Sequence, residues 1–594
     1  MNIETKTCQN CKKSFNIEPE DFEFYEKIKV PPPTFCPDCR LKRRLIWRNE
    51  RALFKRKCDA TGKEIFSMFH PDAQVRVYDR DYWWSDSWDA TDYGREYDFN
   101  RPFFEQFKEL IRDVPWFSRS VNDTVNSDYC MNAGWLKNCY LLFSAAYNEN
   151  CNYSVDLDNS RECADLFFCS YCELCYTSCG CSNCYKVFYS VDCRNCQETF
   201  YSKNCTNCSN IFGCVNLNNK QYCIFNQQYS AEEYKNKLLE LNPFSYENLD
   251  DNAEKFKEFA YRFPVRSMHG RQNVNVSGDH LNNSKNVSNS YYCGSLEDSR
   301  FCQFLLTPPG SRDCYDFTVF GTNSELVYEN CQSGIDVSRL KFCAYMYPAS
   351  HDAEYSITSP SSSYIFGCAG LKRKQYCILN KQYSKEEYEA LVPKIIQQMN
   401  NMPYIDAQKR EYRYGEFFPM ELSPFAYNET LIYDLFPLSP NEVTSKGYIW
   451  REQTKKTYSI TKLANDLPDK ITDTDDSIVN EVISCLHQGD CPHNCVSAFR
   501  ITSQELDLLR RFNLPLPRLC FACRHSERLS YRNPLKLWHR QCQCGGLTST
   551  NSVYQNTVSH THGVNQCQNT FETSYAPDQP EIIYCESCYQ QEVA

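Results

Sequence analysis

The sequence predicts a mainly β protein with some α-helix. Two blocks of stacked β-solenoid coils, each closed by a helix, are expected to be flanked by cysteine-rich modules at both ends. Three observations predict this fold class. A cysteine frame near the start of the chain returns near its end, cysteines in between recur at twelve-residue steps, and a helix-forming segment occurs twice. Such fixed spacings are typical of repeat architectures.

The terminal frame extends from Cys8 to Cys58 and returns between Cys491 and Cys542. From Cys11 onward the two copies align without a gap at an offset of 484 residues. Matching positions include aromatic, proline and arginine residues as well as cysteines: Cys11, Phe15, Pro31, Cys36, Cys39, Arg40, Arg44, Arg48 and Asn49 correspond to Cys495, Phe499, Pro515, Cys520, Cys523, Arg524, Arg528, Arg532 and Asn533. The match indicates a duplicated module.

Each copy contains two short cysteine pairs, which suit the four-sulfur tetrahedral site that zinc prefers. The expected ligands are Cys8, Cys11, Cys36 and Cys39 in the first copy and Cys491, Cys495, Cys520 and Cys523 in the second. Because protein ligands fill all four positions, structural zinc is favoured over catalytic zinc. The paired knuckles, the proline-rich turn and the CPDCR segment resemble the probable zinc-ribbon (treble-clef) domain family of bacterial proteins.

A third cysteine group lies beyond the second copy. The favoured zinc ligands there are Cys544, Cys567, Cys585 and Cys588. Cys542 is an alternative to Cys544, and His560 and His562 are alternative ligands or exposed loop residues. Their spacing places both histidines on one side of a strand. The cofactor expected from the sequence is therefore about two to three zinc ions per chain.

Length and composition restrict the class of protein. A chain of 594 residues is long enough for several domains. Its 38 cysteines would suit a secreted disulfide protein, but the first residues contain no apolar signal segment and no run is long enough to span a membrane. We therefore expect a cytoplasmic protein with reduced thiols and no membrane association. The net charge of −11 restricts any nucleic-acid contact to a local patch.

The central part of the chain contains the repeats. Cysteines anchor the first block at positions 139, 151, 163, 175, 184, 196 and 208, twelve apart except for one nine-residue step. The segment 212–241 returns as 366–395, and each copy contains a capping box, Ser230 with Glu233 and Ser384 with Glu387, that predicts the start of a helix. The number of residues per coil stays open.

The expected domains follow in chain order: a zinc-ribbon module over 1–58, a β extension with a helix over 59–127, a β-solenoid block over 128–265, a second block over 266–400, a connector over 401–484, the second zinc-ribbon module over 485–542, and a third zinc module over 543–594.

One cysteine run in the first block, Cys169, Cys172, Cys175 and Cys179, has the spacing of a bacterial iron–sulfur motif. Two of these cysteines are a repeat anchor and the position four residues after an anchor, and the second block lacks most of the counterparts. Buried thiols are therefore favoured over a metal site in this block.

Arginines follow the second cysteine pair of each module at four-residue spacing. Arg40, Arg44 and Arg48 in the first copy, and Arg524, Arg528 and Arg532 in the second, would lie on one helical face. This face could grip phosphates, lie in solvent, or dock on the chain's own acidic surface. These six residues are the nucleic-acid candidates.

Most of the chain resembles a group of zinc-ribbon, cysteine-rich β-solenoid proteins of candidate-phyla bacteria. The resemblance rests on segments such as WWSDSWDATDYGREYDF, GEFFPMELSPFAYNET and FETSYAPDQPEIIYCESCY, and it implies architecture without an activity. No phosphate loop, HExxH or GxSxG motif is present, so no catalytic residues are expected. The leading hypothesis is a non-enzymatic zinc protein that contacts nucleic acid or a ribonucleoprotein. The alternatives are a protein-binding scaffold and, more remotely, a redox or iron–sulfur protein.

Overall fold

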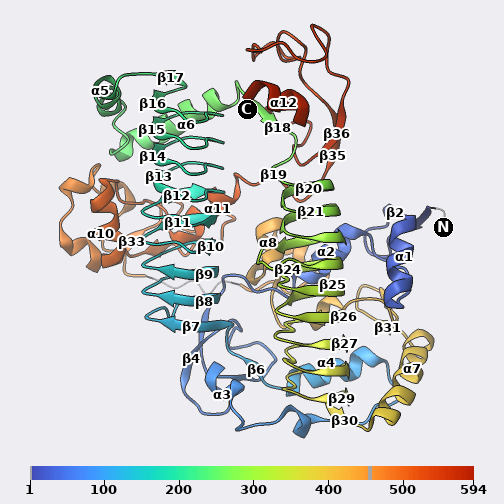
Figure 1. Cartoon of the computed structure of the whole chain (residues 1–594). Helices are drawn as coiled ribbons and strands as arrows, with labels where there is room; N and C mark the ends of the chain where they lie inside the picture. The colour runs from blue at the N-terminus through green and yellow to red at the C-terminus, as the bar shows by residue number, and fades with distance from the viewer. Residues whose placement is uncertain (1–2, 453–457, 594) are drawn as a thin grey trace. The chain divides into compact units, whose positions relative to one another are not determined.

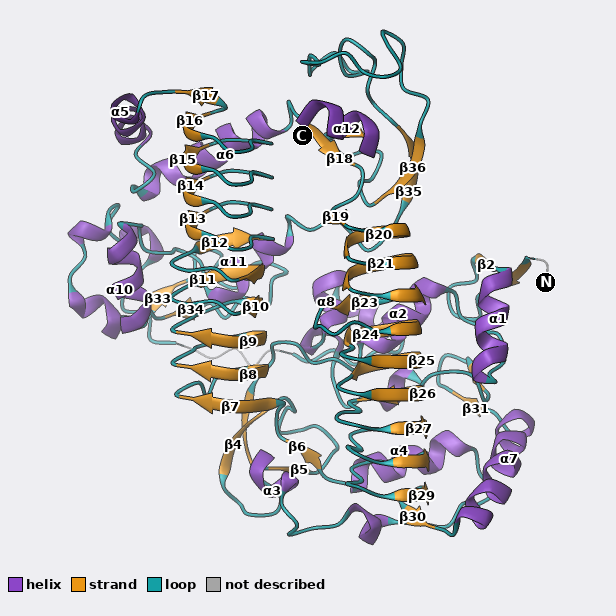
Figure 2. Ribbon diagram, viewed as in Figure 1, coloured by secondary structure: helices purple, strands orange, loops and turns teal. Residues whose placement is uncertain are grey.

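The computed structural model describes residues 3–452 and 458–593 and is mainly β with helices (Figure 2). It divides into two compact units. Unit 1 comprises Met1–Arg119, Met268–Glu452 and Leu535–Leu537, and unit 2 comprises Ser120–Ser267, Gln453–Pro534 and Trp538–Ala594. Within the described ranges, no helix combines the length and the apolar character that a membrane crossing requires.

The first stack, in unit 2, is an eleven-stranded sheet whose strands follow one another in chain order from β7 to β17 (Figure 1). Neighbouring strands are parallel except β16 and β17, which form a closing hairpin. Each parallel strand pairs with the next at an offset of twelve residues, as in Phe143 with Val155 and Val155 with Phe167. One coil of this stack therefore contains twelve residues. Its strands are β7 (Val121–Val125), β8 (Met131–Lys137), β9 (Phe143–Glu149), β10 (Val155–Asp158), β11 (Ala164–Ser170), β12 (Tyr176–Cys179), β13 (Tyr185–Phe188), β14 (Gln197–Phe200), β15 (Ser209–Phe212), β16 (Gln221–Ile224) and β17 (Gln227–Gln228).

From Asn132 to Phe225, every third residue of the first stack turns the backbone into the left-handed region. From Asn132 to Tyr153 the φ values of these residues lie between 49° and 58°. Asparagine adopts this conformation more readily than most residues, which explains its frequency at such positions. The residue after each bend is an inner one, so inner positions recur every three residues and each twelve-residue coil has four short sides.

Small side chains that can form hydrogen bonds occupy many of these inner positions. The backbone N–H of Leu166 donates to Ser154 Oγ at 3.0 Å, and the N–H of Cys175 donates to Cys163 Sγ at 3.4 Å. The same side chains donate in turn to backbone carbonyls, as Cys163 Sγ does to Cys172 O at 3.5 Å. Cysteine and serine therefore satisfy buried backbone groups while filling a narrow interior.

A helical segment closes the first stack. Helix α5 (Ala231–Leu241) contacts β16 and begins with the predicted capping box, in which Ser230 Oγ accepts from Glu233 N and the Glu233 carboxylate accepts from Ser230 N. Helix α6 (Leu249–Ala260) follows.

The second stack, in unit 1, is a twelve-stranded sheet that starts with β19 and ends with the hairpin β29–β30 (Figure 1). Its coils are less regular than those of the first stack, with offsets from eleven residues (Val274 with Lys285) to fifteen (Glu297 with Arg312). Helix α7 (Lys385–Asn401) contacts β29 and has the predicted capping box of Ser384. The strands are β19 (Gly270–Arg271), β20 (Val274–Asn282), β21 (Lys285–Gly294), β22 (Glu297–Arg300), β23 (Gln303–Leu305), β24 (Arg312–Phe320), β25 (Ser324–Ser333), β26 (Val337–Ala344), β27 (His351–Glu354), β28 (Ser363–Phe366), β29 (Gln375–Ile378) and β30 (Lys381–Gln382).

Short hairpins and helices make up the cysteine modules. Those of unit 1 are β1 (Glu4–Thr7), β2 (Ser14–Ile17), α1 (Pro19–Ile28), α2 (Pro37–Leu45), β3 (Phe54–Lys57), β4 (Glu64–Ser67), β5 (Val77–Tyr78) and α3 (Arg80–Trp84). Those of unit 2 are β33 (Ile483–Ser484), β34 (Ala498–Phe499), α10 (Ser503–Phe512), α11 (Phe521–Leu529), β35 (Trp538–Gln541), β36 (Thr570–Thr573), β37 (Ile582–Tyr584) and α12 (Glu586–Val593).

Candidate metal centres

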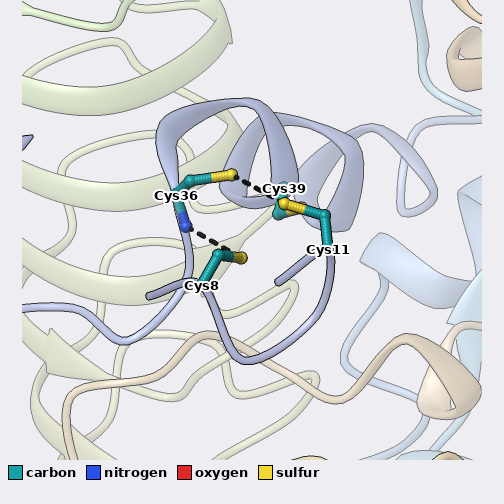
Figure 3. A group of neighbouring side chains, drawn as sticks. All are labelled: Cys8, Cys11, Cys36 and Cys39. Carbon is teal, nitrogen blue, oxygen red and sulfur yellow. Dashed lines mark hydrogen bonds between the residues drawn. The ribbon is translucent and has the colours of Figure 1, made fainter. Parts of the chain in front are cut away.

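The N-terminal module brings together the four cysteines predicted from the sequence. Cys8 follows β1, Cys36 is the N-cap of α2, and Cys39 lies in the first turn of that helix (Figure 3). The sulfur atoms of these three residues and of Cys11 lie within 4.8 Å of one another. The group could therefore hold one metal ion.

The middle module forms its four-sulfur group from Cys485, Cys495, Cys520 and Cys523, with the same mutual distances. The sequence alignment placed Cys491 in the first position, and the structure corrects this to Cys485. The hairpins show why. Cys8 directly follows the strand that pairs with β2, and Cys485 directly follows the strand that pairs with β34. The loop between β33 and β34 is longer than the loop between β1 and β2. Cys491, the nearest cysteine before Cys495 in the sequence, is therefore not the equivalent of Cys8.

The C-terminal module forms its four-sulfur group from Cys542, Cys567, Cys585 and Cys588. Cys542 thus takes the place for which the sequence favoured Cys544. Cys544 lies instead in a neighbouring group with His560, His562 and Cys588.

One hydrogen bond establishes the equivalence of the three groups. The backbone N–H of the residue before the last helix donates to the first cysteine of the group: Cys36 to Cys8 at 3.3 Å, Cys520 to Cys485 at 3.3 Å, and Cys585 to Cys542 at 3.2 Å. The last two cysteines of each group lie at the N-terminal end of a helix, where the helix dipole favours thiolate.

The thiols within each group interact electrostatically. Hydrogen bonds with Cys36 and Cys39 lower the pKa of Cys8, and hydrogen bonds with Cys485, Cys495 and Cys523 lower the pKa of Cys520. In the C-terminal module, a hydrogen bond with Cys542 lowers the pKa of Cys585 to about 4. Each group therefore contains a thiol that readily becomes the thiolate that a metal requires.

Unit 2 contains a second group beside each four-sulfur group. In the middle module it consists of His487, Cys491, His493 and Cys523, whose donor atoms lie within 4.8 Å of one another. Cys523 therefore belongs to both groups of its module, as Cys588 does in the C-terminal module.

Unit 1 retains the frame of the C-terminal module without most of its ligands. The hairpin β3–β4 has the same register as β35–β36, and Cys58 accepts the backbone N–H of Asp79 at 3.1 Å, as Cys542 accepts that of Cys585. At the positions equivalent to Cys567, Cys585 and Cys588, this copy has Thr61, Asp79 and Tyr82. The duplication therefore includes both module types, although the frame beginning at Cys58 contains one cysteine of the four.

Comparison with known proteins found no family model and no curated protein that matches this chain. The assignment of a function therefore depends on the geometry alone.

The arginines predicted to face nucleic acid are buried in unit 1. Helix α2 packs on β24 and β25, and Arg40 and Arg44 both reach the carboxylate of Asp316, each at 2.9 Å. Arg44 also contacts Glu329 at 3.2 Å. Arg48 pairs with Glu50 at 2.6 Å. All three arginines are nearly inaccessible to solvent, so this part of the prediction is corrected.

The equivalent helix of unit 2 is docked in the same way. Helix α11 packs on β11, where Arg524 and Arg528 reach the Asp165 carboxylate at 2.5 and 2.7 Å. Arg524 also pairs with Glu505 at 2.9 Å. The guanidinium of Arg532 lies over the ring of Phe167, 5.8 Å from its centre. In both units, therefore, arginines of a module helix are anchored on a stack, and their carboxylate partners Asp165, Asp316 and Glu329 occupy left-handed bends.

The cysteines of the iron–sulfur-like run have ordinary roles in the stack. Cys169, Cys172 and Cys175 are three successive inner positions, and their thiols donate to backbone carbonyls. Burial raises the pKa of Cys169 and of Cys175 well above its usual range, which keeps them as thiols. The CxxC spacing of this run thus equals the length of one side of a coil.

Sequence reasoning missed three residues of these sites: Cys485, His487 and His493. A signal was present. The segment CLHQGDCPHNC places a cysteine or histidine at almost every second position, and alignment from the hairpin strands rather than from Cys11 would have included it.

Proposed function

We propose that this protein is a non-enzymatic, zinc-stabilised scaffold. Zinc-ribbon (treble-clef) modules would clamp β-solenoid blocks whose surface binds a protein partner. The observation that carries the proposal is the burial of the module arginines. Because Arg40, Arg44, Arg524 and Arg528 are buried in ion pairs with Asp165, Asp316 and Glu329, these four cations offer no phosphate-binding face.

Zinc is the proposed metal because thiolates from four cysteines suit its tetrahedral preference and leave no open position for a reacting water. All 38 cysteines lie within the described residues, and none of them forms a disulfide there. Free thiols in this number suit a reducing compartment, so the cytoplasm is the proposed location.

An exposed aromatic column on the first stack is the proposed contact surface. Trp135 and Tyr147 are one coil apart and stack with their ring centres 4.6 Å apart, and Tyr171 occupies the same bend two coils further on. These three side chains are 47%, 54% and 60% exposed. Exposed tyrosine and tryptophan side chains are enriched at protein interfaces.

The test is capture of partners from native lysate treated with nuclease, comparing the full chain with the variant Trp135→Ala, Tyr147→Ala, Tyr171→Ala. We expect loss of nuclease-resistant partners with unchanged zinc content and melting. Tyr364→Ala, at an exposed aromatic of the second stack, is the matched control. Capture that disappears on nuclease treatment of the wild type would refute the protein-scaffold function and favour nucleic-acid contact through other residues.

A further inference from the structure

We propose that each cysteine module of unit 2 holds a pair of zinc ions that share one thiolate, Cys523 in the middle module and Cys588 in the C-terminal module. The proposal rests on the zinc binding proposed above. It adds a second ion to each of these two modules.

The two modules supply their ligands in the same chain order. The four-sulfur group is called the inner site, and the neighbouring group the outer site. In chain order, the middle module has Cys485 (inner), His487, Cys491 and His493 (outer), Cys495 and Cys520 (inner) and Cys523 (shared). The C-terminal module has Cys542 (inner), Cys544, His560 and His562 (outer), Cys567 and Cys585 (inner) and Cys588 (shared). Both outer sites therefore consist of one cysteine, two histidines and the shared thiolate. This donor set suits tetrahedral zinc.

The outer ligands lie in loops that only unit 2 has lengthened. In unit 1 the loops of the two equivalent hairpins, Cys8–Lys13 and Cys58–Lys63, contain six residues each. In unit 2 the corresponding loops, Cys485–Ser497 and Cys542–Asn569, contain thirteen and twenty-eight. Each enlarged loop brings one cysteine and two histidines back to the shared thiol. A structural insertion alone would not require this repeated donor set.

The outer site of the C-terminal module has the surroundings of a metal site. His560 Nδ1 lies 3.5 Å from Cys544 Sγ, and its other ring nitrogen lies 3.2 Å from the Glu592 carboxylate. His562 Nε2 lies 3.4 Å from Cys588 Sγ, and its Nδ1 lies 2.7 Å from the carbonyl of Asn565. A histidine with one nitrogen toward the metal and the other hydrogen-bonded to a carboxylate or carbonyl is the usual arrangement around zinc.

The outer site of the middle module leaves nitrogen atoms to be satisfied. The Nδ1 atoms of His487 and His493 are buried and have no hydrogen-bond partner in the described part of the chain. The two rings lie 5.6 Å apart, and Cys491 Sγ lies 3.7 Å from the shared Cys523 Sγ. A metal ion would satisfy these buried acceptors, which otherwise carry a desolvation cost.

The charge balance between thiolates and zinc also favours two ions over one in each of these modules. Four thiolates around one divalent cation leave two excess negative charges in a buried site, whereas five thiolates around two cations leave one. The second ion therefore reduces the uncompensated charge that the inner site would bury.

The first measurement is zinc content by elemental analysis of the full chain, purified under reducing, chelator-free conditions. We expect about five ions per chain, one in unit 1 and two in each module of unit 2. The double variant His487→Gln, His493→Gln should lose about one ion, and His560→Gln, His562→Gln should lose another. His539→Gln is the matched control, because His539 is exposed on β35 and lies outside these groups.

The second measurement tests the shared thiolate. The protein is loaded with ¹¹³Cd, and scalar coupling between cadmium resonances is recorded, since such coupling requires a common sulfur ligand. We expect two coupled pairs and one uncoupled resonance. Each histidine double variant should abolish the coupling of its own module and retain the inner resonance, which also shows that the variant is folded.

The outcomes separate this proposal from the proposed function. About three ions, insensitive to the histidine changes, would overturn the paired sites and leave the zinc scaffold standing. Five ions without cadmium coupling would overturn the bridge. Less than one ion per chain would overturn both.

Discussion

The anchoring of α11 on the first stack predicts a large local effect for Asp165→Asn. Asp165 is fully buried and accepts from Arg524 at 2.5 Å and from Arg528 at 2.7 Å, so the change leaves two buried guanidinium groups short of a counter-charge. Removing one partner of a buried ion pair costs about 3–5 kcal/mol. Glu505 still pairs with Arg524, whereas among the described residues Arg528 retains a hydrogen bond to the carbonyl of Tyr153 and no carboxylate partner. We therefore expect about 4 kcal/mol.

Hydrogen exchange on peptides covering β11 and α11 measures this loss locally, which suits a chain of two compact units because proteins of several units generally do not unfold in a single two-state transition. A loss of about 4 kcal/mol corresponds to exchange that is about a thousandfold faster. Glu162→Gln is the matched control, since Glu162 lies in the same coil and pairs with the half-exposed Arg511 at 2.9 Å. A surface pair is worth less than about 1 kcal/mol.

If Asp165→Asn changes exchange no more than Glu162→Gln does, the arginines are not anchored in this way. The interpretation of α11 as a docking helix would then be refuted, and its arginines would again be candidates for contact with nucleic acid.

Three further predictions concern the stacks. Ser384→Ala removes the cap of α7 and should cost unit 1 about 1 kcal/mol, measured by denaturant unfolding. Gly213→Ala should lower the free energy of unfolding by about 2–4 kcal/mol, because φ is +65° and the added Cβ would lie 2.6 Å from the Phe225 ring. Gly62→Ala is the control, with φ +72° and open space around the added Cβ, and should cost only about 1–2 kcal/mol. Equal effects of the two changes would contradict the packing argument. Protein purified without oxygen should be colourless near about 400 nm, and an absorbance there that disappears in Cys172→Ala would show that the buried thiols hold an iron–sulfur cluster.

The cysteine modules were predictable as far as their spacing was regular. The N-terminal set of Cys8, Cys11, Cys36 and Cys39 has no insertion, and the structure brings its four sulfur atoms together. The middle set was displaced by one cysteine because a loop of thirteen residues replaces one of six. Alignment by cysteine identity therefore chose Cys491, whereas the strand register, which the structure provides, selects Cys485.

For the stacks, the length of the repeat could be predicted from the sequence, but the number of residues on each side of a coil could not. The twelve-residue cysteine step is the offset between paired strands of the first stack. The sequence did not reveal that each side of a coil contains three residues, so the CxxC pairs of the first stack looked like metal-binding knuckles. The nine-residue step from Cys175 to Cys184 has the same origin, because it moves three inner positions along the chain rather than four. Cysteine spacing alone cannot distinguish three residues along a coil side from three residues across a knuckle.

The role of the arginines depended on contacts that no local pattern contains. Arginines four residues apart on a helix look the same in a sequence whether they face solvent, phosphate or a carboxylate. Their partners here are distant: Asp316 is 276 residues from Arg40, and Asp165 is 359 residues from Arg524. The N-terminal module docks on the second stack and the middle module on the first, so neither helix is anchored on the stack that is nearer to it in the sequence. Burying these arginines requires a carboxylate at a bend of the stack, so the acidic residues that pair with them also hold their guanidinium groups away from solvent.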